Sequence, residues 1–306
     1  MIQSPYSYLE TPSLLIDNDR ALANIQMMQQ KADALGLKLR PHIKTHRMPY
    51  FAKLQMEAGA CGIACAKIGE AEVMADHGIG DIFIANEVIG EDKHERLKRL
   101  HRRVHVRIGI DNEVQLAQME KVFATEARPL EVQIEYEVGE VRTGVTNDEQ
   151  LTRLVAAIQA CKHVVLKGIF SHEGHTYKAA SIADCCEKAQ IAYTKTVRAA
   201  EIIRGMGVEL DTVSVGATPS VMHMQSFPGI TELRLGRIFS LTWGSPTPSA
   251  ILTAARRRCW RRSSPSRRAT AWCWTRARRR SSRRTARPAS APRRASARSR
   301  ARKILP

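Results

Sequence analysis

Acidic residues are missing from the C-terminal end of the sequence, although they are common before it. The 306 residues include 48 Lys and Arg against 30 Asp and Glu, so the formal net charge is +18. Residues 251–306 hold 19 Arg, one Lys and no acidic residue, and they alone carry +20. The remaining 28 basic and 30 acidic residues leave residues 1–250 at −2. The basic composition therefore indicates no nucleic-acid or membrane partner for residues 1–250.

Long apolar runs are also missing. No stretch approaches the roughly 18 apolar residues that a membrane-spanning helix requires, and the N-terminus lacks the apolar segment of a signal peptide. Cysteine is sparse before residue 251, with an odd number of residues at Cys61, Cys65, Cys161, Cys185 and Cys186. The pair at 61 and 65 has no second pair after it, which disfavours a zinc site. We expect a cytoplasmic protein with reduced thiols.

Apolar periodicity is absent from the arginine-rich end. The last fifty residues are mostly Arg, Ser, Ala, Pro and Thr, and neither a repeat of 2 nor one of 3.6 runs through them. One interpretation is a natural tail that neutralises phosphates. The other is a GC-rich gene read out of frame from a point between residues 236 and 255, because back-translation of 259–264 and 270–281 in a neighbouring frame yields strand-like sequences. We favour the second, and we predict that residues 241–306 are an unstructured tail.

Residues 1–240 instead alternate between strand-like and helical segments. Amphipathic stretches predict helices at residues 18–35, with Gly36 as the C-cap, at 148–161 and at 179–204. Eight β-like runs lie at residues 37–43, 61–65, 81–85, 104–110, 131–138, 164–170, 211–215 and 231–235. Eight strands alternating with helices predict an α/β fold, the (β/α)8 or TIM barrel. The competing doubly wound sheet usually has a glycine-rich first turn, and KTHRMP at 44–49 contains no glycine.

A barrel of this type carries its chemistry at the carboxyl ends of its strands. Those ends hold Lys44, Arg142, His172, His175 and Tyr177 after the first, fifth and sixth strands. The seventh strand ends in small residues whose backbone N–H groups suit a phosphate at a helix start, Gly216, Ala217 and Thr218. We expect these groups to meet at one mouth and to bind an anionic ligand there.

Five segments, in order, resemble one family of enzymes. They are RPHIKTHR at 40–47, AKIGEAEVMADHGIGDIFIANEV at 66–88, IEYEVGEVRTGV at 134–145, FSHEGHTY at 170–177 and VSVGATPS at 213–220. Together they are similar to the D-threonine aldolase and D-serine dehydratase group of alanine racemase-like enzymes, which depend on pyridoxal 5'-phosphate. The resemblance extends from about Thr11 to Gly236 and implies that residues 1–240 are the cofactor-binding barrel.

The resemblance implies a role for each residue at the mouth. The lysine of the P-H-x-K-T-H motif forms the Schiff base with the cofactor in that family, and it corresponds to Lys44. The arginine of the R-x-G-V motif faces the pyridine ring and corresponds to Arg142, while Tyr177 is expected to contact the cofactor. The G-x-T-P-S turn holds the phosphate and corresponds to Gly216, Ala217 and Thr218.

The implied function is a lyase that cleaves β-hydroxy D-amino acids such as D-threonine to glycine and an aldehyde. Cleavage needs a base on the β-hydroxyl, which His175 or a metal-bound water could supply; His172, Tyr177 and His42 are second choices. D-serine dehydratase or racemase activity, and cofactor binding without catalysis, are alternatives within the same fold. A nucleic-acid binder that acts through residues 251–306 is the alternative from another class.

Two departures from the family pattern bear on activity. Relatives have a C-terminal β-domain in which a His and a Cys or Asp bind a divalent metal, but no histidine follows His223 here. Arg234-Leu235-Gly236 also stands where relatives usually have R-P-G. We therefore predict that the metal ligands are missing, that residues 241–306 replace the β-domain, and that turnover is weak or absent. A homodimer is expected for the intact family, with less support for this chain.

Each assigned residue also has a purely structural interpretation. Lys44 could be a solvated lysine at a strand end, and Arg142 could pair with Glu137 or Glu140. The histidines of SHEGH could brace their loop, and GATPS could be an ordinary turn with Thr or Ser as the helix N-cap. These alternatives predict different contacts for the same side chains.

Overall fold

The β-like runs form eight parallel strands of one sheet. The computed structural model describes residues 13–238 and 258–260. Its strands are β2 (Lys38–Leu39), β3 (Ile63–Cys65), β4 (Asp81–Glu87), β5 (His105–Ile110), β6 (Leu130–Glu135), β7 (Val164–Phe170), β8 (Thr212–Val215) and β9 (Glu232–Leu233). Each strand overlaps one of the eight predicted runs, so the eight-strand prediction is confirmed.

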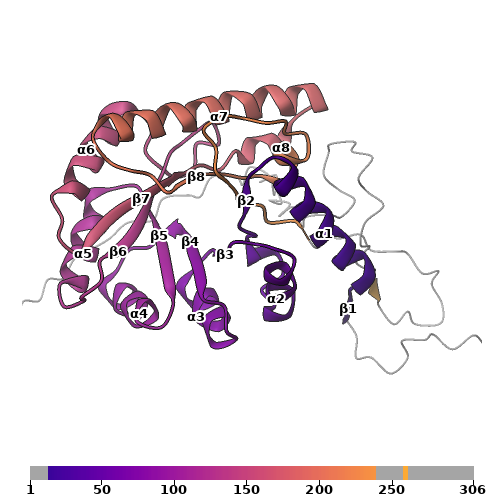
Figure 1. Ribbon diagram of the computed structural model, residues 1–306, viewed down its shortest axis with the longest axis horizontal. Coiled ribbons are helices and arrows are strands. Elements are labelled where there is room, and N and C mark those ends of the chain that lie inside the picture. Colours follow the sequence, from indigo (N-terminus) through magenta and orange to yellow (C-terminus); the bar gives the residue numbers. More distant parts are fainter. Residues whose placement is uncertain (1–12, 239–257, 261–306) are drawn as a thin grey trace, which may run out of the picture. The chain divides into compact units, whose positions relative to one another are not determined.

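Helices connect successive strands and cover the outside of the sheet (Figure 1). They are α1 (Asn18–Ala34), α2 (Pro49–Glu57), α3 (Ile68–Asp76), α4 (Glu91–His101), α5 (Glu113–Phe123), α6 (Asp148–Gln159), α7 (Ile182–Gly205) and α8 (Thr218–Met222). Side chains of Asp17, Asn112, Asn147 and Ser181 cap α1, α5, α6 and α7 by accepting a backbone N–H of the first turn. Gly36 follows α1 with a φ of +68°, as predicted for its C-terminal end. Within the described residues, no helix has both the length and the apolar character that crossing a membrane demands.

The sheet closes on itself, which makes it a (β/α)8 barrel. Its strand order is β2-β9-β8-β7-β6-β5-β4-β3. The two outer strands of this order meet through few hydrogen bonds: Cys61 N–H donates to the Leu39 oxygen (2.9 Å) and Ala64 N–H to the Pro41 oxygen (2.8 Å). A single parallel bridge joins His42 to Ala64. We call this contact the seam, and its short pairing follows from the two-residue length of β2.

A separate antiparallel pair joins β1 (Ser13–Leu15) to β10 (Arg258–Trp260). Three residues of the predicted tail 241–306 are therefore in a strand, and the rest of that prediction lies outside the described residues. The absence of apolar periodicity did not exclude this strand, because antiparallel pairing uses backbone groups.

Apolar side chains fill the space between the sheet and the helices. The interior of the barrel contains a layer of charged side chains followed by a layer of aromatic rings. At the amino ends of the strands, the buried Arg40 binds Asp81 (Nη1–Oδ1 2.5 Å) and Glu232 (Nε–Oε2 2.8 Å). Next come Phe83 and Phe170, whose rings meet edge to face at 5.0 Å between centroids. These rings form the floor of the mouth at the carboxyl ends of the strands.

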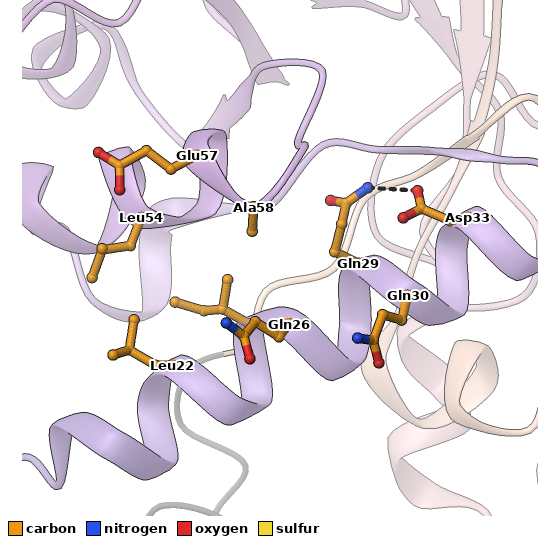
Figure 2. Close-up of a pocket in the computed structure, with 9 residues that line it drawn as sticks. Leu22, Gln26, Gln29, Gln30, Asp33, Leu54, Glu57 and Ala58 are labelled. Atoms are coloured by element: carbon orange, nitrogen blue, oxygen red, sulfur yellow. Dashed lines mark hydrogen bonds between the residues drawn. The ribbon is translucent and has the colours of Figure 1, made fainter.

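A groove of about 460 Å³ lies on the outside, between α1 and α2 (Figure 2). Its lining is Leu22, Ile25, Gln26, Gln29, Gln30, Asp33, Leu54, Glu57 and Ala58. Gln29 donates to Asp33 there at 2.8 Å. The groove contains none of the residues predicted for the mouth, so it is separate from the candidate site.

Candidate active site at the barrel mouth

Lys44 lies directly after β2, in a single turn of 3-10 helix, η1 (Ile43–Thr45). Two contacts fix this turn to the segment after β9: His42 N–H donates to the Leu235 oxygen at 2.7 Å, and Thr45 Oγ1 donates to the Gly236 oxygen at 2.5 Å. A Cβ on Gly236 would lie 3.7 Å from Lys44 Cε. The lysine chain therefore runs along the glycine that follows β9.

Lys44 is exposed at the mouth, and the surrounding residues partly desolvate its amine. This desolvation, together with the positive charges of Arg234 and Arg142, lowers the pKa of Lys44 from 10.5 to about 8, while Glu140 and Glu135 oppose the change. Neither the desolvation nor the positive charges would lower the pKa of a freely solvated lysine. The neutral, nucleophilic form of the amine is thus more accessible near neutral pH than for an ordinary lysine.

Arg142 lies on the loop after β6, half exposed. It pairs with Glu135 (Nη2–Oε1 3.3 Å) and with Glu140 (Nη1–Oε2 3.5 Å). Glu137, the other predicted partner, instead accepts the N–H groups of Gly139 (2.6 Å) and Val141 (2.8 Å). Val141 has a φ of +55°, an unfavourable conformation for a β-branched residue. The loop is therefore held in a strained shape from which Arg142 meets two carboxylates of the mouth.

His172 follows β7 and has a defined orientation. Its Nδ1 is 2.8 Å from the Gly216 oxygen, so Nδ1 carries the proton and Nε2 is the free acceptor. Nε2 lies 3.7 Å from Glu140 Oε2. Burial, then Arg234 and Lys44, lower the pKa of His172 to about 3, so the ring is neutral. His42 is buried beside Lys44, and burial and the lysine likewise hold its pKa well below the usual range.

The turn Gly216-Ala217 is organised by Glu173, a residue that the sequence did not single out. Glu173 is fully buried; its carboxylate accepts Gly216 N–H (3.2 Å), Ala217 N–H (2.7 Å) and the Ser220 hydroxyl (2.6 Å). In this structure Glu173 thus accepts both of the N–H groups that were predicted to bind a phosphate. The suggested Thr or Ser N-cap is wrong: Ala217 is the N-cap of α8.

Thr218, Tyr177 and Arg237 meet at the start of α8. Thr218 N–H donates to the Tyr177 hydroxyl oxygen at 3.3 Å, and Arg237 N–H donates to Thr218 Oγ1 at 3.2 Å. The Arg237 guanidinium lies 5.0 Å from the centre of the Tyr177 ring. Of the predicted phosphate turn, Thr218 is thus the residue that faces a phenol and a cation.

His175 lies in η2 (Gly174–Lys178) against the loop after β6. A Cβ on Gly139 would be 3.0 Å from His175 Cε1, so the imidazole packs on that glycine. Its Nδ1 is buried without a hydrogen-bond partner among the described residues. The structure thus brings the loops carrying His175 and Arg142 together, and it leaves one imidazole nitrogen for a ligand.

Arg234, which sequence reasoning noted only as part of an unusual R-L-G, is central to the mouth. Its guanidinium lies 4.9 Å from the centre of the Phe170 ring and 6.0 Å from that of Phe83. Nη2 donates to the Ser171 oxygen at 2.6 Å, but the buried Nε has no partner among the described residues. A buried cationic donor without an acceptor points to a ligand atom at the floor of the mouth.

No three His, Cys, Asp or Glu side chains within residues 13–238 and 258–260 are grouped so that they could hold a metal ion. The imidazoles of His42, His172 and His175, the amine of Lys44 and three guanidinium groups lie at a mouth whose anions are carboxylates. This arrangement suits an anionic, carbonyl-bearing ligand that reacts with an amine.

Known proteins share this architecture. A D-threonine aldolase of an Arthrobacter species is 31% identical over 232 residues, which are 76% of this chain and 61% of that protein. A D-threo-3-hydroxyaspartate dehydratase of a Delftia species is 34% identical over 74% of this chain and 60% of that protein. Its solved structure matches with a TM-score of 0.72, over 78% of this chain and 63% of that one.

The crystal structure of D-threonine aldolase from Filomicrobium marinum matches with a TM-score of 0.71 and 30% identity, over 75% of this chain and 62% of that one. The chain therefore spans about three fifths of the length of these relatives. The family model described as "Alanine racemase, N-terminal domain" matches residues 16–241. With that match and the closed barrel, the chain belongs to the alanine racemase N-terminal domain family.

Proposed function

We propose that this barrel binds pyridoxal 5'-phosphate through Lys44 and belongs to a lyase that acts on β-hydroxy D-amino acids. The single observation that carries the proposal is the place of Lys44, which lies in η1 after β2 with its Cε beside Gly236, in a mouth that also holds Arg142 and Arg234. The named activities of the relatives, D-threonine aldolase and D-threo-3-hydroxyaspartate dehydratase, support the same class of substrate.

The residues of the mouth fit this cofactor. Lys44 supplies the amine, Thr218 and Tyr177 supply hydroxyl donors for the phosphate, and Arg237 supplies a positive charge. Gly216 and Ala217 shape the turn, since Glu173 holds their N–H groups. When bound, the cofactor acts as an electron sink that stabilises negative charge at the substrate carbon next to the amine.

Two guanidinium groups compete for the pyridine nitrogen. The resemblance assigns Arg142 to it, but Arg142 is half exposed and already pairs with Glu135 and Glu140. Arg234 is buried and has an unpaired Nε. We propose that Arg234 binds at the floor of the mouth and that Arg142 lies at the rim, where it can bind a substrate carboxylate bidentately.

His175 is our proposal for the base that removes the proton from the β-hydroxyl. Its Nδ1 is buried without a partner among the described residues, so it can accept a hydrogen bond from a substrate. His172 is less suited, because its pKa of about 3 makes Nε2 a weak base. Its hydrogen bond to the Gly216 oxygen orients it beside the phosphate turn instead.

Lys44 can be tested directly. We expect the chain mixed with pyridoxal 5'-phosphate to turn yellow, and borohydride to fix the cofactor to the peptide that contains Lys44. Lys44→Ala should lose the colour, whereas Lys67→Ala, which changes an exposed lysine at the start of α3, should keep it. Colour of equal strength in Lys44→Ala would contradict the assignment.

The substrate class is tested by the products. Glycine and an aldehyde from D-threonine indicate the aldolase, whereas ammonia and a keto acid from D-threo-3-hydroxyaspartate indicate the dehydratase. We expect slow but measurable turnover of one of the two compounds. Cofactor attachment without any turnover of either compound would leave a cofactor-binding protein and overturn the lyase.

A further inference from the structure

Two carboxyl groups in the mouth have no part in the function proposed above. Glu87 is the last residue of β4, and Glu135 is the last residue of β6. β5 lies between these strands, and its Gly109 is opposite Glu87 on one side and Gln133 on the other. The two glutamates therefore approach each other across the middle strand.

Gly109 makes that approach possible. A Cβ on Gly109 would lie 3.2 Å from Glu87 Oε1 and 2.9 Å from Phe170 Cζ, so a larger residue would fill the space that the Glu87 side chain crosses. The strand register and the open space at Gly109 therefore bring the carboxyl groups of Glu87 and Glu135 close together, and Glu135 is one of the groups that raise the pKa of Glu87 after burial. Two ionised carboxylates in one buried space repel each other, and Glu87 Oε1 has no donor among the described residues, so a proton on one of the two carboxyls is favoured.

The surroundings decide which glutamate carries the proton. Glu135 accepts from Thr143 Oγ1 (2.9 Å) and from Arg142 Nη2 (3.3 Å), and these donors favour its ionised form. Glu87 Oε1 is buried and has no donor among the described residues, which would be costly for an ionised oxygen. Burial, and then Glu135 and Asp111, raise the pKa of Glu87 to about 9.

We propose that Glu87 is a positioning residue that shares one proton with Glu135, so that the pair presents a single negative charge to Lys44 and Arg142. The inference rests on the proposed role of Lys44 as the amine that takes the cofactor. The other charged groups that face the pair are Arg234 on the floor, Glu140 on the loop after β6 and Asp111 after β5.

The single charge matters because of its effect on the amine. Glu135 raises the pKa of Lys44, and Arg234 and Arg142 lower it. A second negative charge at Glu87 would favour the protonated amine, which is not a nucleophile. The shared proton therefore keeps a larger fraction of Lys44 neutral, while Glu135 still holds Arg142.

Glu87→Gln tests the proposal, because the amide keeps the shape and the donor but carries no charge. We expect the pH profile for acylation of Lys44, measured by peptide mass spectrometry without added cofactor, to stay within about twofold of wild type. If both carboxyls were ionised, the variant would lose one charge, and the pKa of Lys44 would fall by about 1 unit. Labelling below pH 8 would then rise about tenfold, which would overturn the proposal.

Infrared spectroscopy gives an independent readout. The carbonyl stretch of a protonated carboxylic acid should be present in the wild type at neutral pH and absent from Glu87→Gln. Glu91→Gln, an exposed glutamate of α4, should keep the signal. The double variant Glu87→Gln with Glu135→Gln is the positive control for the acylation experiment. It removes the one negative charge of the pair, so acylation of Lys44 below pH 8 should rise about tenfold. A wild type without the signal contradicts the shared proton.

Neither measurement uses the cofactor, so the two proposals fail separately. A chain that shows the carbonyl stretch and the unchanged Lys44 profile but takes up no pyridoxal 5'-phosphate would retain the shared proton and lose the proposed function. Thermal unfolding of each variant, followed by circular dichroism, shows that the comparison is made between folded proteins.

Discussion

Because Gly216 has no side chain, the segment after β8 can lie against the segment after β9. Gly216 follows β8 directly, and a Cβ there would lie 2.6 Å from the carbonyl carbon and 2.8 Å from the nitrogen of Arg234. Arg234 N–H donates to the Val215 oxygen at 2.7 Å, so the neighbouring backbone is hydrogen-bonded and has little freedom to move. Glycine here permits the close approach of the turn Gly216-Ala217 to the segment that carries Arg234.

Gly216→Ala should therefore lower the free energy of unfolding by about 1–3 kcal/mol, the usual range for overpacking. The measurement is the midpoint of urea unfolding. Gly205→Ala is a matched control at the end of α7, where a Cβ would have nothing within 4 Å. This variant should be neutral or more stable by up to about 1 kcal/mol. Equal shifts for both variants would show that the contact with Arg234 does not determine the effect.

The residues of the mouth differ in how well the sequence reveals them. Lys44, Arg142, His175, Tyr177 and Thr218 were placed at the mouth by their position after predicted strands, and the structure puts them there. Glu173, Glu87 and Arg234 were not singled out, since glutamate and arginine are usually solvated and their burial depends on neighbours far away in the sequence. Glu173 does stand inside FSHEGHTY, and that motif was the one signal for it.

Among the neighbouring strands of the barrel, the two that meet at the seam have the fewest paired positions. β6 and β7 share six paired positions in the register of the sheet, whereas β2 and β9 share two and β2 meets β3 at one bridge. Backbone hydrogen bonds in short, sparsely paired segments open more easily than those in a central ladder. Lys44 follows the seam directly, so opening there would move the amine relative to the rest of the mouth.

Native-state hydrogen exchange should detect this difference. We expect the amide protons of Cys61 and Ala64, which donate across the seam, to exchange faster than those of Val132 and Ile134 in the central strand β6. Equal protection of all four amides would mean that the barrel opens only by global unfolding.

Element types could be predicted from the sequence more readily than element lengths. All eight strands of the barrel were predicted, because β-branched runs alternate with helical segments, some of which begin at a capping residue such as Asn147 or Ser181. The first strand was predicted as 37–43 but is observed as Lys38–Leu39, since His42 turns into η1. β1 and β10 were missed, because a three-residue strand has no detectable periodicity.

At the scale of the whole molecule, the charge is divided between two parts of the sequence. Residues 1–250 carry −2 and residues 251–306 carry +20. The described ion pairs are consistent with a balanced barrel: Arg40 with Asp81, and Arg102 with Glu126. Any strong attraction to polyanions should therefore belong to the arginine-rich segment and not to the mouth.

Removing residues 251–306 separates DNA binding by the arginine-rich segment from cofactor binding by the mouth. We expect the full chain to bind DNA of arbitrary sequence with an affinity that falls steeply with salt, and the shortened chain to lose this binding. The yellow colour with pyridoxal 5'-phosphate should remain, because the residues assigned to the mouth, from Lys44 to Arg237, all precede residue 251. Loss of colour together with DNA binding would instead show that the segment contributes to the mouth.

The strands of the barrel are synthesised in the order in which most of them pair. Strands β3 to β8 each pair with the next strand in the sequence, so they can assemble as the chain leaves the ribosome. The barrel closes when β9 reaches β2, and β9 ends at Leu233. Translation has therefore specified the closing strand before it reaches residue 236, and a change in the gene beyond that codon alters what is attached to the barrel without altering the strands that close it.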